Sequence, residues 1–332
     1  MQRARILILL VSGSALSYGP GKKRLVQSER EVAAWMREMQ ELSIMAEIDA
    51  TYVANAEGSG VSPALWQSIG RVISDNYTKF DGFVISHEVE TLHYTAPALG
   101  AALGNTGKPV VLTASPHDLL RPKVPANIRA LFAHARGLGQ KDNLLNALHV
   151  AEYSFGDVCA VFGNQIHRAI ELTTVAPPDA QYFRSLSGIL LGKVDFGLKL
   201  FPPIRKQSNR AVKFATDFAS DMVVIDVHPG MQITDRLSGE VMKAPGVLVK
   251  LDPASQLSSA HVSALEKLQK SKVPVIVYQQ EAQQDRLSSL PLLHTLPYHS
   301  AFVLSSWIFA QAKNTTQVQR LLKEKIKEIL HH

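Results

Sequence analysis

Short apolar runs alternate with segments of helical periodicity along most of this chain, and this alternation constrains the fold more than any other feature. A strand that is buried on both faces of a sheet has an almost continuous apolar sequence. Such runs occupy residues 5–11, 43–50, 82–87, 109–114 and 158–162. The pattern predicts an α/β fold in which a mostly parallel sheet is covered by helices on both faces.

Helix-start signals lie between the apolar runs. Ser28 and Glu31 have the spacing of a capping box, in which a hydroxyl and a carboxylate satisfy free backbone N–H groups. Ser62 is followed by Pro63, which is typical of an N-cap with proline at the first helical position. Further helices are expected over residues 96–103 and 142–153.

The alternation of apolar runs and helical segments is interrupted near residues 201–209. Here Pro202 and Pro203 precede polar and charged residues, as in a linker. The alternation then resumes, with expected strands over 222–227, 246–251 and 274–278 and expected helices over 260–272, 301–313 and 316–330. A chain of 332 residues is long enough for two domains. We therefore predict a larger α/β domain over residues 1–204, a linker over 205–216 and a smaller α/β domain over 217–332.

Composition argues against several classes of partner. The net charge is +6, but the two basic runs, 21–24 and 320–327, contain no interleaved aromatic residues, so no nucleic acid partner is expected. No segment approaches the about 18 apolar residues of a membrane span, so no membrane partner is expected. The glycine-rich signatures of nucleotide sites are absent, and no cofactor is expected.

Two features bear on the compartment. The single cysteine, Cys159, lies in an apolar run and excludes an intrachain disulfide, which favours a reducing, cytoplasmic location. Residues 6–11 and the small residues after them allow two interpretations, a short signal peptide or the first strand of an α/β domain. The strand is favoured because the α/β rhythm continues directly after it.

Polar side chains follow the first and third expected strands, where parallel sheets bind ligands. The first loop contains Ser12, Ser14 and Tyr18, and could hold a polar ligand or remain a flexible turn. The third loop, 86–95, contains two carboxylates, two imidazoles and several hydroxyls, which suits acid–base chemistry. His87, Glu90 and His93 could in principle bind a metal, but they lack the His-Glu-x-x-His spacing, and no metal is expected.

Several segments of the chain resemble the bacterial-type L-asparaginase family. Residues 81–99 resemble DGFVVLHGTDTMAYTASAL, residues 107–115 resemble GKPVVLTGS, residues 143–148 match NLLNAL, and 228–231 resemble YPGI. The resemblance implies two α/β domains and hydrolysis of a side-chain amide. A small amino-acid or amide ligand and a homo-oligomer are also implied.

The resemblance carries some site residues over to this chain. In the family a threonine of the first loop and a Thr–Asp pair of the third loop act with a distant lysine, because a hydroxyl needs a base before it can attack. Ser14 keeps a hydroxyl at the first position, and Tyr18 could stand for the family's loop tyrosine. Thr91 matches the last residue of GTDT. The substrate-binding segment DSSDM falls on residues 57–61, which makes Glu57 and Ser59 candidate substrate-binding residues.

Other positions depart from the family motif. Glu88 stands at the glycine of GTDT, Val89 at its catalytic threonine and Glu90 at its aspartate, while Thr174 stands at the lysine. Valine has no hydroxyl and cannot replace the catalytic threonine. Glutamate is one methylene longer than aspartate, so its carboxylate is displaced, and catalytic rates fall steeply with errors of about 1 Å.

These residues support two hypotheses. The first is a divergent asparaginase-family protein, a pseudoenzyme with little or no L-asparagine amidohydrolase activity. The second is an active amidohydrolase in which Ser14 is the nucleophile, Glu90 acts as a base or orienting group, and Tyr18 or Thr91 assists. An unrelated α/β binding protein remains a third interpretation.

Overall fold

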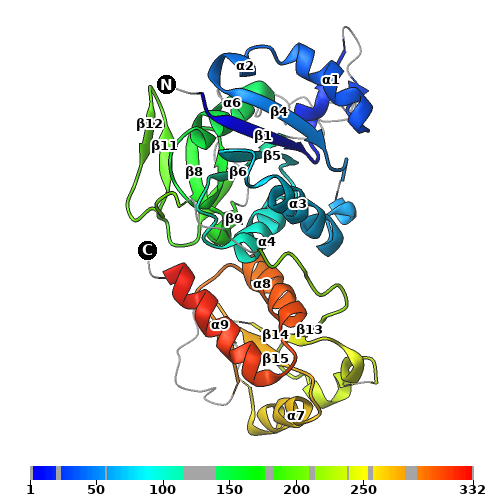
Figure 1. Ribbon diagram of the computed structural model, residues 1–332. Helices are drawn as coiled ribbons and strands as arrows, with labels where there is room; N and C mark the ends of the chain where they lie inside the picture. The colour runs from blue at the N-terminus through cyan, green and yellow to red at the C-terminus, as the bar shows by residue number, and fades with distance from the viewer. Residues whose placement is uncertain are drawn as a thin grey trace. The chain divides into compact units, whose positions relative to one another are not determined.

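The computed structural model describes residues 3–19, 24–56, 58–115, 140–175, 182–208, 214–237, 239–252, 257–280 and 290–330. The chain divides into two compact units, Met1–Phe214 and Ala215–His331, and each contains helices and a β-sheet of its own (Figure 1). The predicted fold class, two α/β domains with the larger one first, is confirmed.

The described residues of the first unit form a sheet of eight strands in the order β12-β11-β8-β7-β6-β5-β1-β4. Its parallel part consists of β4 (Glu47–Tyr52), β1 (Arg5–Leu10), β5 (Gly82–Glu88), β6 (Val110–Ser115) and β7 (Val158–Phe162). The antiparallel part consists of β8 (Gln165–Arg168), β11 (Gly192–Val194) and β12 (Leu198–Leu200). Two small antiparallel pairs accompany it, β2 (Ser17–Tyr18) with β3 (Arg24–Leu25) and β9 (Leu172–Thr174) with β10 (Phe183–Ser185).

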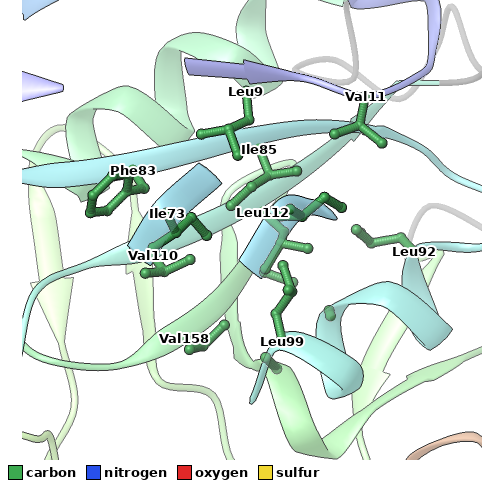
Figure 2. Packing of buried hydrophobic residues seen from close by; sticks show 14 of the residues in the cluster. Leu9, Val11, Ile73, Phe83, Ile85, Leu92, Leu99, Val110, Leu112 and Val158 are labelled. Atoms are coloured by element: carbon green, nitrogen blue, oxygen red, sulfur yellow. The ribbon is translucent and has the colours of Figure 1, made fainter. Parts of the chain in front are cut away.

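Helices cover both faces of this sheet. One face packs against α3 (Pro63–Asn76) and α4 (Leu92–Leu103), and the other against α1 (Glu29–Glu38), α2 (Leu42–Met45) and α6 (Gln140–Ala151). Side chains of β1 alternate between the two cores: Leu7 and Leu9 enter the first, whereas Ile6 and Ile8 enter the second. Figure 2 shows the first core, where residues of β1, β5, β6 and β7 meet those of α3 and α4.

Short 3₁₀ turns connect several of these elements. In the first unit they are η1 (Ser14–Leu16), η2 (Gly58–Gly60) and η4 (Ala169–Glu171), and in the second η5 (Ile233–Arg236) and η6 (Val241–Lys243). Two of them, η1 and η2, directly follow strands β1 and β4, so they lie at the carboxyl edge of the sheet.

The second unit contains a smaller parallel sheet. Its described strands run in the order β13 (Val223–Val227), β14 (Val247–Leu251), β15 (Val275–Tyr278) and β16 (Leu292–Leu293). Its helices are α7 (Ser259–Lys270), α8 (Tyr298–Gln311) and α9 (Thr315–Leu330). Within the described ranges of the chain, no helix is long and apolar enough to span a membrane.

Local predictions from the sequence needed correction at three places. The apolar run 43–50 contains the end of α2 and the start of β4, because a short apolar run does not distinguish a helix from a strand. Helix α4 begins at Leu92 and includes Pro97, although proline lacks the N–H for the helical bond. The capping box of α1 is not formed: Ser28 makes no cap bond, and the carboxylate of Glu31 accepts from the backbone N–H of Gln27 at 2.7 Å.

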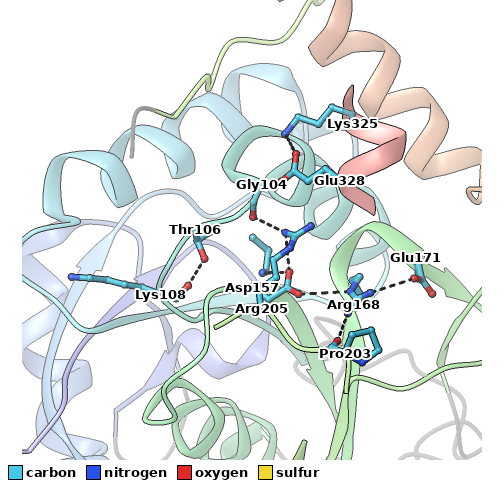
Figure 3. A network of polar contacts seen from close by, with 11 residues as sticks. Gly104, Thr106, Lys108, Asp157, Arg168, Glu171, Pro203, Arg205, Lys325 and Glu328 are labelled. Atoms are coloured by element: carbon cyan, nitrogen blue, oxygen red, sulfur yellow. Dashed lines mark hydrogen bonds and ion pairs between the residues drawn. The ribbon is translucent and has the colours of Figure 1, made fainter. Parts of the chain in front are cut away.

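The segment directly after β12 is held against the large sheet of the first unit by a network of polar contacts (Figure 3). Asp157 is buried, and its two carboxylate oxygens lie 3.4 Å from Nη1 of Arg205 and 3.7 Å from Nε of Arg168. Arg168 also donates to the carbonyl of Pro203 at 3.0 Å. The backbone N–H of Gly156 donates to the carbonyl of Arg205 at 2.9 Å. Residues 203–205 are therefore anchored on the end of β8 and the start of β7.

Candidate functional site

The strand order places a topological switch point at the end of β1. From β1 the chain continues to β4 on one side of it and then to β5 on the other, so the order of the sheet reverses between β1 and β5. Loops diverge at such a switch point, and open α/β sheets bind ligands there, beyond the carboxyl ends of the strands. The loops after β1, β4 and β5 meet at this edge.

The loop after β1 lies directly against the end of β5. Gly13 has φ +88°, and a Cβ there would lie 2.4 Å from the carbonyl oxygen of His87 and 2.7 Å from Oγ of Ser115, so only glycine fits. The hydroxyl of Ser12 accepts a hydrogen bond of 2.9 Å from the backbone N–H of Glu88. The first and third loops therefore contact each other at the switch point.

The two predicted residues of the first loop have different surroundings. Ser14 is fully buried in η1, and among the described residues its Oγ has no hydrogen-bond partner. The hydroxyl of Tyr18 donates to Oε1 of Glu31 on α1 at 2.9 Å, and the guanidinium of Arg24 lies 5.4 Å from its ring centre. The hydrogen bond to Glu31 raises the pKa of Tyr18 above its usual value. Tyr18 is thus engaged with α1.

Glu88, the last residue of β5, places a carboxylate between the loops. Its side chain is buried, and Oε1 accepts two hydrogen bonds: one of 2.8 Å from the backbone N–H of Gly58 and one of 2.6 Å from Oγ1 of Thr91. Gly58 belongs to the loop after β4, and Thr91 is the N-cap residue of α4. One oxygen therefore joins two loops at the switch point.

The neighbours of Glu88 are placed differently. Val89 is fully buried and belongs to the apolar core beneath α3 and α4. Glu90, the predicted base or orienting group, has an exposed side chain. Thr91, predicted to assist, is half-buried and contacts Glu88. The structure thus joins Thr91 to Glu88, and no described contact joins Glu90 or Tyr18 to Ser14.

His87 is locked by a chain of buried hydrogen bonds. Its Nδ1 lies 2.9 Å from the carbonyl oxygen of Glu88, which can only accept, so Nδ1 carries the proton. Its Nε2 lies 3.0 Å from Oγ1 of Thr95, which accepts from Nε1 of Trp66 at 3.2 Å. Burial lowers the pKa of His87, although Glu88 opposes this shift. A neutral ring with both nitrogens bonded is not available as a base.

The remaining predicted positions are partly outside the described structure. Glu57 lies outside the described residues, and so does the side chain of Ser59. Thr174, at the lysine position of the family motif, is half-buried in β9 and pairs with Phe183 of β10. In the described part of the chain, no group of three His, Cys, Asp or Glu side chains is placed to hold a metal ion.

Sequence reasoning missed the position of the Glu88 carboxylate. The substitution itself was visible, because glutamate stands where the family motif has glycine. Which of two nearby glutamates turns inward depends on the turn after β5, and that turn has no periodic pattern. Nor does the sequence indicate the two groups that donate hydrogen bonds to Glu88, the backbone N–H of Gly58 and the hydroxyl of Thr91.

Comparison with known proteins now defines the class. Residues 5–203 match the asparaginase family described as "Asparaginase, N-terminal". This match covers more than half of the 332 residues, and the chain belongs to the asparaginase family.

Individual relatives resemble different parts of the chain. L-asparaginase 1 of Escherichia coli K12 is 38% identical over 123 residues, which cover 37% of this chain and 32% of that protein. The match thus spans about a third of that relative's length. An L-asparaginase of Dirofilaria immitis is 24% identical over 250 residues, covering 74% of this chain and 38% of that protein.

Two solved structures resemble this chain over almost its whole length. The crystal structure of L-asparaginase I from Vibrio cholerae has a TM-score of 0.76 at 20% identity and covers 97% of both chains. The thermostable L-asparaginase from Thermococcus kodakarensis has a TM-score of 0.74 at 18% identity and covers 96% of both chains. At 18% and 20% sequence identity, this likeness establishes the fold alone.

Proposed function

We propose that this asparaginase-family protein is a divergent member that hydrolyses L-asparagine little or not at all. The observation that carries the proposal is the end of β5, where a buried valine and a hydrogen-bonded glutamate stand at the motif positions of a threonine and a glycine. A small amino-acid or amide ligand, a homo-oligomer and a cytoplasmic location are parts of the same proposal, and they come from the family resemblance.

Val89 supports the loss of one catalytic hydroxyl. Its side chain is fully buried in the apolar core, and valine can neither attack a carbonyl nor pass on a proton. Thr174 supports the loss of the base, because its neutral hydroxyl stands at the lysine position of the motif and cannot take up a proton at neutral pH. A hydroxyl nucleophile without an activating base is weak.

A second candidate, an active amidohydrolase that uses Ser14, is favoured by one observation. The Ser14 hydroxyl is fully buried and has no hydrogen-bond partner among the described residues, as an unengaged nucleophile would have. However, none of the described side chains with basic character donates to or accepts from this hydroxyl, and His87 is occupied at both ring nitrogens. We therefore rank this candidate second.

Ammonia release from L-asparagine and L-glutamine tests the proposal, with L-asparaginase 1 of Escherichia coli assayed beside it. We expect turnover at least about a hundredfold below the control, the scale on which single catalytic groups act. The matched variant Ser14→Ala should release ammonia at the same residual rate as the wild type. Turnover close to that of the control, and abolished by Ser14→Ala, would contradict the proposal and establish the second candidate.

A further inference from the structure

A cavity of about 430 Å³ lies in the second unit, between α7, labelled in Figure 1, and the segment that contains η5 and η6. Along α7 its lining runs from Ala260 to Ser271, which is about 16 Å of helix. The apolar residues of its described lining are Leu237, Met242, Ala260, Ala264 and Leu268. Ligand sites have volumes in this range and mostly apolar walls. The cavity therefore has the size and the elongated outline of a site for a small, chain-like ligand.

Both walls of this cavity are fixed by the core of the second unit. Helix α7 begins with a formed capping box, in which the hydroxyl of Ser258 accepts from the backbone N–H of His261 at 3.2 Å. Leu265 and Leu268 of α7 are buried in the core, and Leu237 of the opposite wall packs against the same core. The cavity is therefore preformed, and a ligand that enters it orders little additional chain.

The polar groups of the cavity are concentrated on one face of α7. Lys267 is the only charged residue of the described lining, its side chain is exposed, and among the described residues no carboxylate forms an ion pair with it. Ser263 precedes Lys267 by four residues, so its hydroxyl and the ammonium group lie on the same face of the helix. Helical side chains point back towards the N-terminus, so a carboxylate between these two groups would lie ahead of the last carbonyls of α7, whose partial negative charge is unfavourable to anions.

The charge and the apolar wall together define the class of ligand. One unpaired cation with no anion in the described lining complements a single negative charge. The wall opposite α7 contains Met242, which is 44% exposed and whose flexible side chain can adapt to an apolar chain. A ligand that satisfies both features has one carboxylate and an unbranched apolar tail.

We propose that this cavity binds medium-chain aliphatic monocarboxylates. The aliphatic chain lies between α7 and the η5–η6 segment, against Leu237, Met242 and Leu268, and the carboxylate accepts hydrogen bonds from Nζ of Lys267 and Oγ of Ser263. This inference goes beyond the proposed function, because it concerns a second site, in the second unit, and makes no use of amide hydrolysis.

Equilibrium dialysis of the full chain with radiolabelled octanoate tests the inference. We expect saturable binding to a single site. Hexanoate, which is shorter by two methylenes, should bind about fifteenfold more weakly, because each buried methylene tightens binding about fourfold. 1-Octanol, which has the chain without the charge, should bind about tenfold more weakly than octanoate, because the charge-assisted hydrogen bonds are lost.

Two pairs of variants locate the site. Lys267→Gln removes the charge and should weaken octanoate binding about tenfold while it leaves 1-octanol binding unchanged. Lys270→Gln is its control, because Lys270 belongs to the same last turn of α7 but does not line the cavity. Ala260→Leu, at an exposed position that allows the variant to fold, fills the cavity and should abolish binding. Ala33→Leu, at an exposed position of α1, is the matched control for added apolar surface.

The outcomes are separable from those of the proposed function. Saturable octanoate binding that is lost in Ala260→Leu, weakened in Lys267→Gln and kept in both controls supports the inference. Absence of saturable binding, or equal binding by the wild type and either cavity variant, overturns it. Ammonia release from L-asparagine by the wild type would contradict the proposed function and leave the dialysis result unchanged, so failure of one is distinguishable from failure of the other.

Discussion

At the scale of single residues, Glu88, Val89 and Glu90 show which features of a site a sequence motif predicts and which it does not. The sequence identifies these three as substitutions within a family motif, because the flanking segments keep their spacing. It does not show that Glu88 is buried and bonded while Glu90 is exposed. Side-chain direction after a strand follows from the local turn and its long-range contacts, such as that between Glu88 and Gly58.

A buried histidine gives a prediction for the pH dependence of stability. His167 is buried beside Ser185, with Nδ1 3.2 Å from its Oγ, and burial lowers the pKa of His167 from 6.5 to about 4. The unfolded chain therefore binds this proton more readily than the folded chain. The contribution of the neutral His167 ring to the free energy of unfolding is fully present above pH 6.5. As the pH falls towards about 4, this contribution is lost, and the free energy of unfolding decreases by roughly 3 kcal/mol.

Urea denaturation between pH 7 and pH 4 measures this loss. His167→Gln should flatten the acid limb of the free energy of unfolding, because the substituted side chain does not take up a proton. His149→Gln, at a partly exposed position on α6, is the matched control and should keep the wild-type slope. An acid limb that is identical in His167→Gln and wild type would rule out this source of the pH dependence.

At the scale of elements, predictions were best for the central strands and poorest for the antiparallel edge. Strands β1, β5, β6 and β7 lie within about a residue of their predicted bounds, because they are buried on both faces and almost wholly apolar. Strands β11 and β12 have three residues each and contain Lys193 and Lys199, so they give no apolar signal. Their pairing depends on contacts distant in sequence, which periodicity does not reveal.

Residues Gly107, Lys108 and Pro109, the start of the segment that resembles GKPVVLTGS, have a structural role that the sequence did not reveal. The segment resembles a family motif, and the strand after these residues was predicted. In the structure Nζ of Lys108 donates to the carbonyls of Tyr77 and Phe80 at 2.7 and 2.6 Å, just beyond the end of α3. A lysine at this end of a helix satisfies free carbonyls and complements the helix dipole.

The network around Asp157 gives a prediction at this scale. Asp157→Ala leaves Arg168 and Arg205 partly buried without their shared carboxylate, so we expect a loss of about 3 kcal/mol in the free energy of unfolding. Asp195→Ala, at an exposed position of the β11–β12 hairpin, should cost less than about 1 kcal/mol. Urea denaturation followed by the fluorescence of Trp35 and Trp66 measures both. Equal losses for the two variants would mean that the network does not stabilise this unit.

At the scale of the whole molecule, fold and site were predictable to different degrees. Alternating apolar runs predicted both α/β sheets, including the second, where only a Pro-Gly turn resembles the family. The switch point also follows from the pattern once the family is identified. What the site does was not predictable, because it depends on which side chain lies at the switch point. Glu88 is held there by hydrogen bonds from Gly58 and Thr91, which belong to two separate loops.

The central claim is that the substitutions at the end of β5 leave this asparaginase-family chain with little or no activity on L-asparagine. Ammonia release by the full wild-type chain in about 10 mM L-asparagine, tenfold above the usual upper range of KM, tests it most directly, with L-asparaginase 1 of Escherichia coli assayed in parallel. We predict turnover at least about a hundredfold below that of the control. Turnover close to that of the control would contradict the claim.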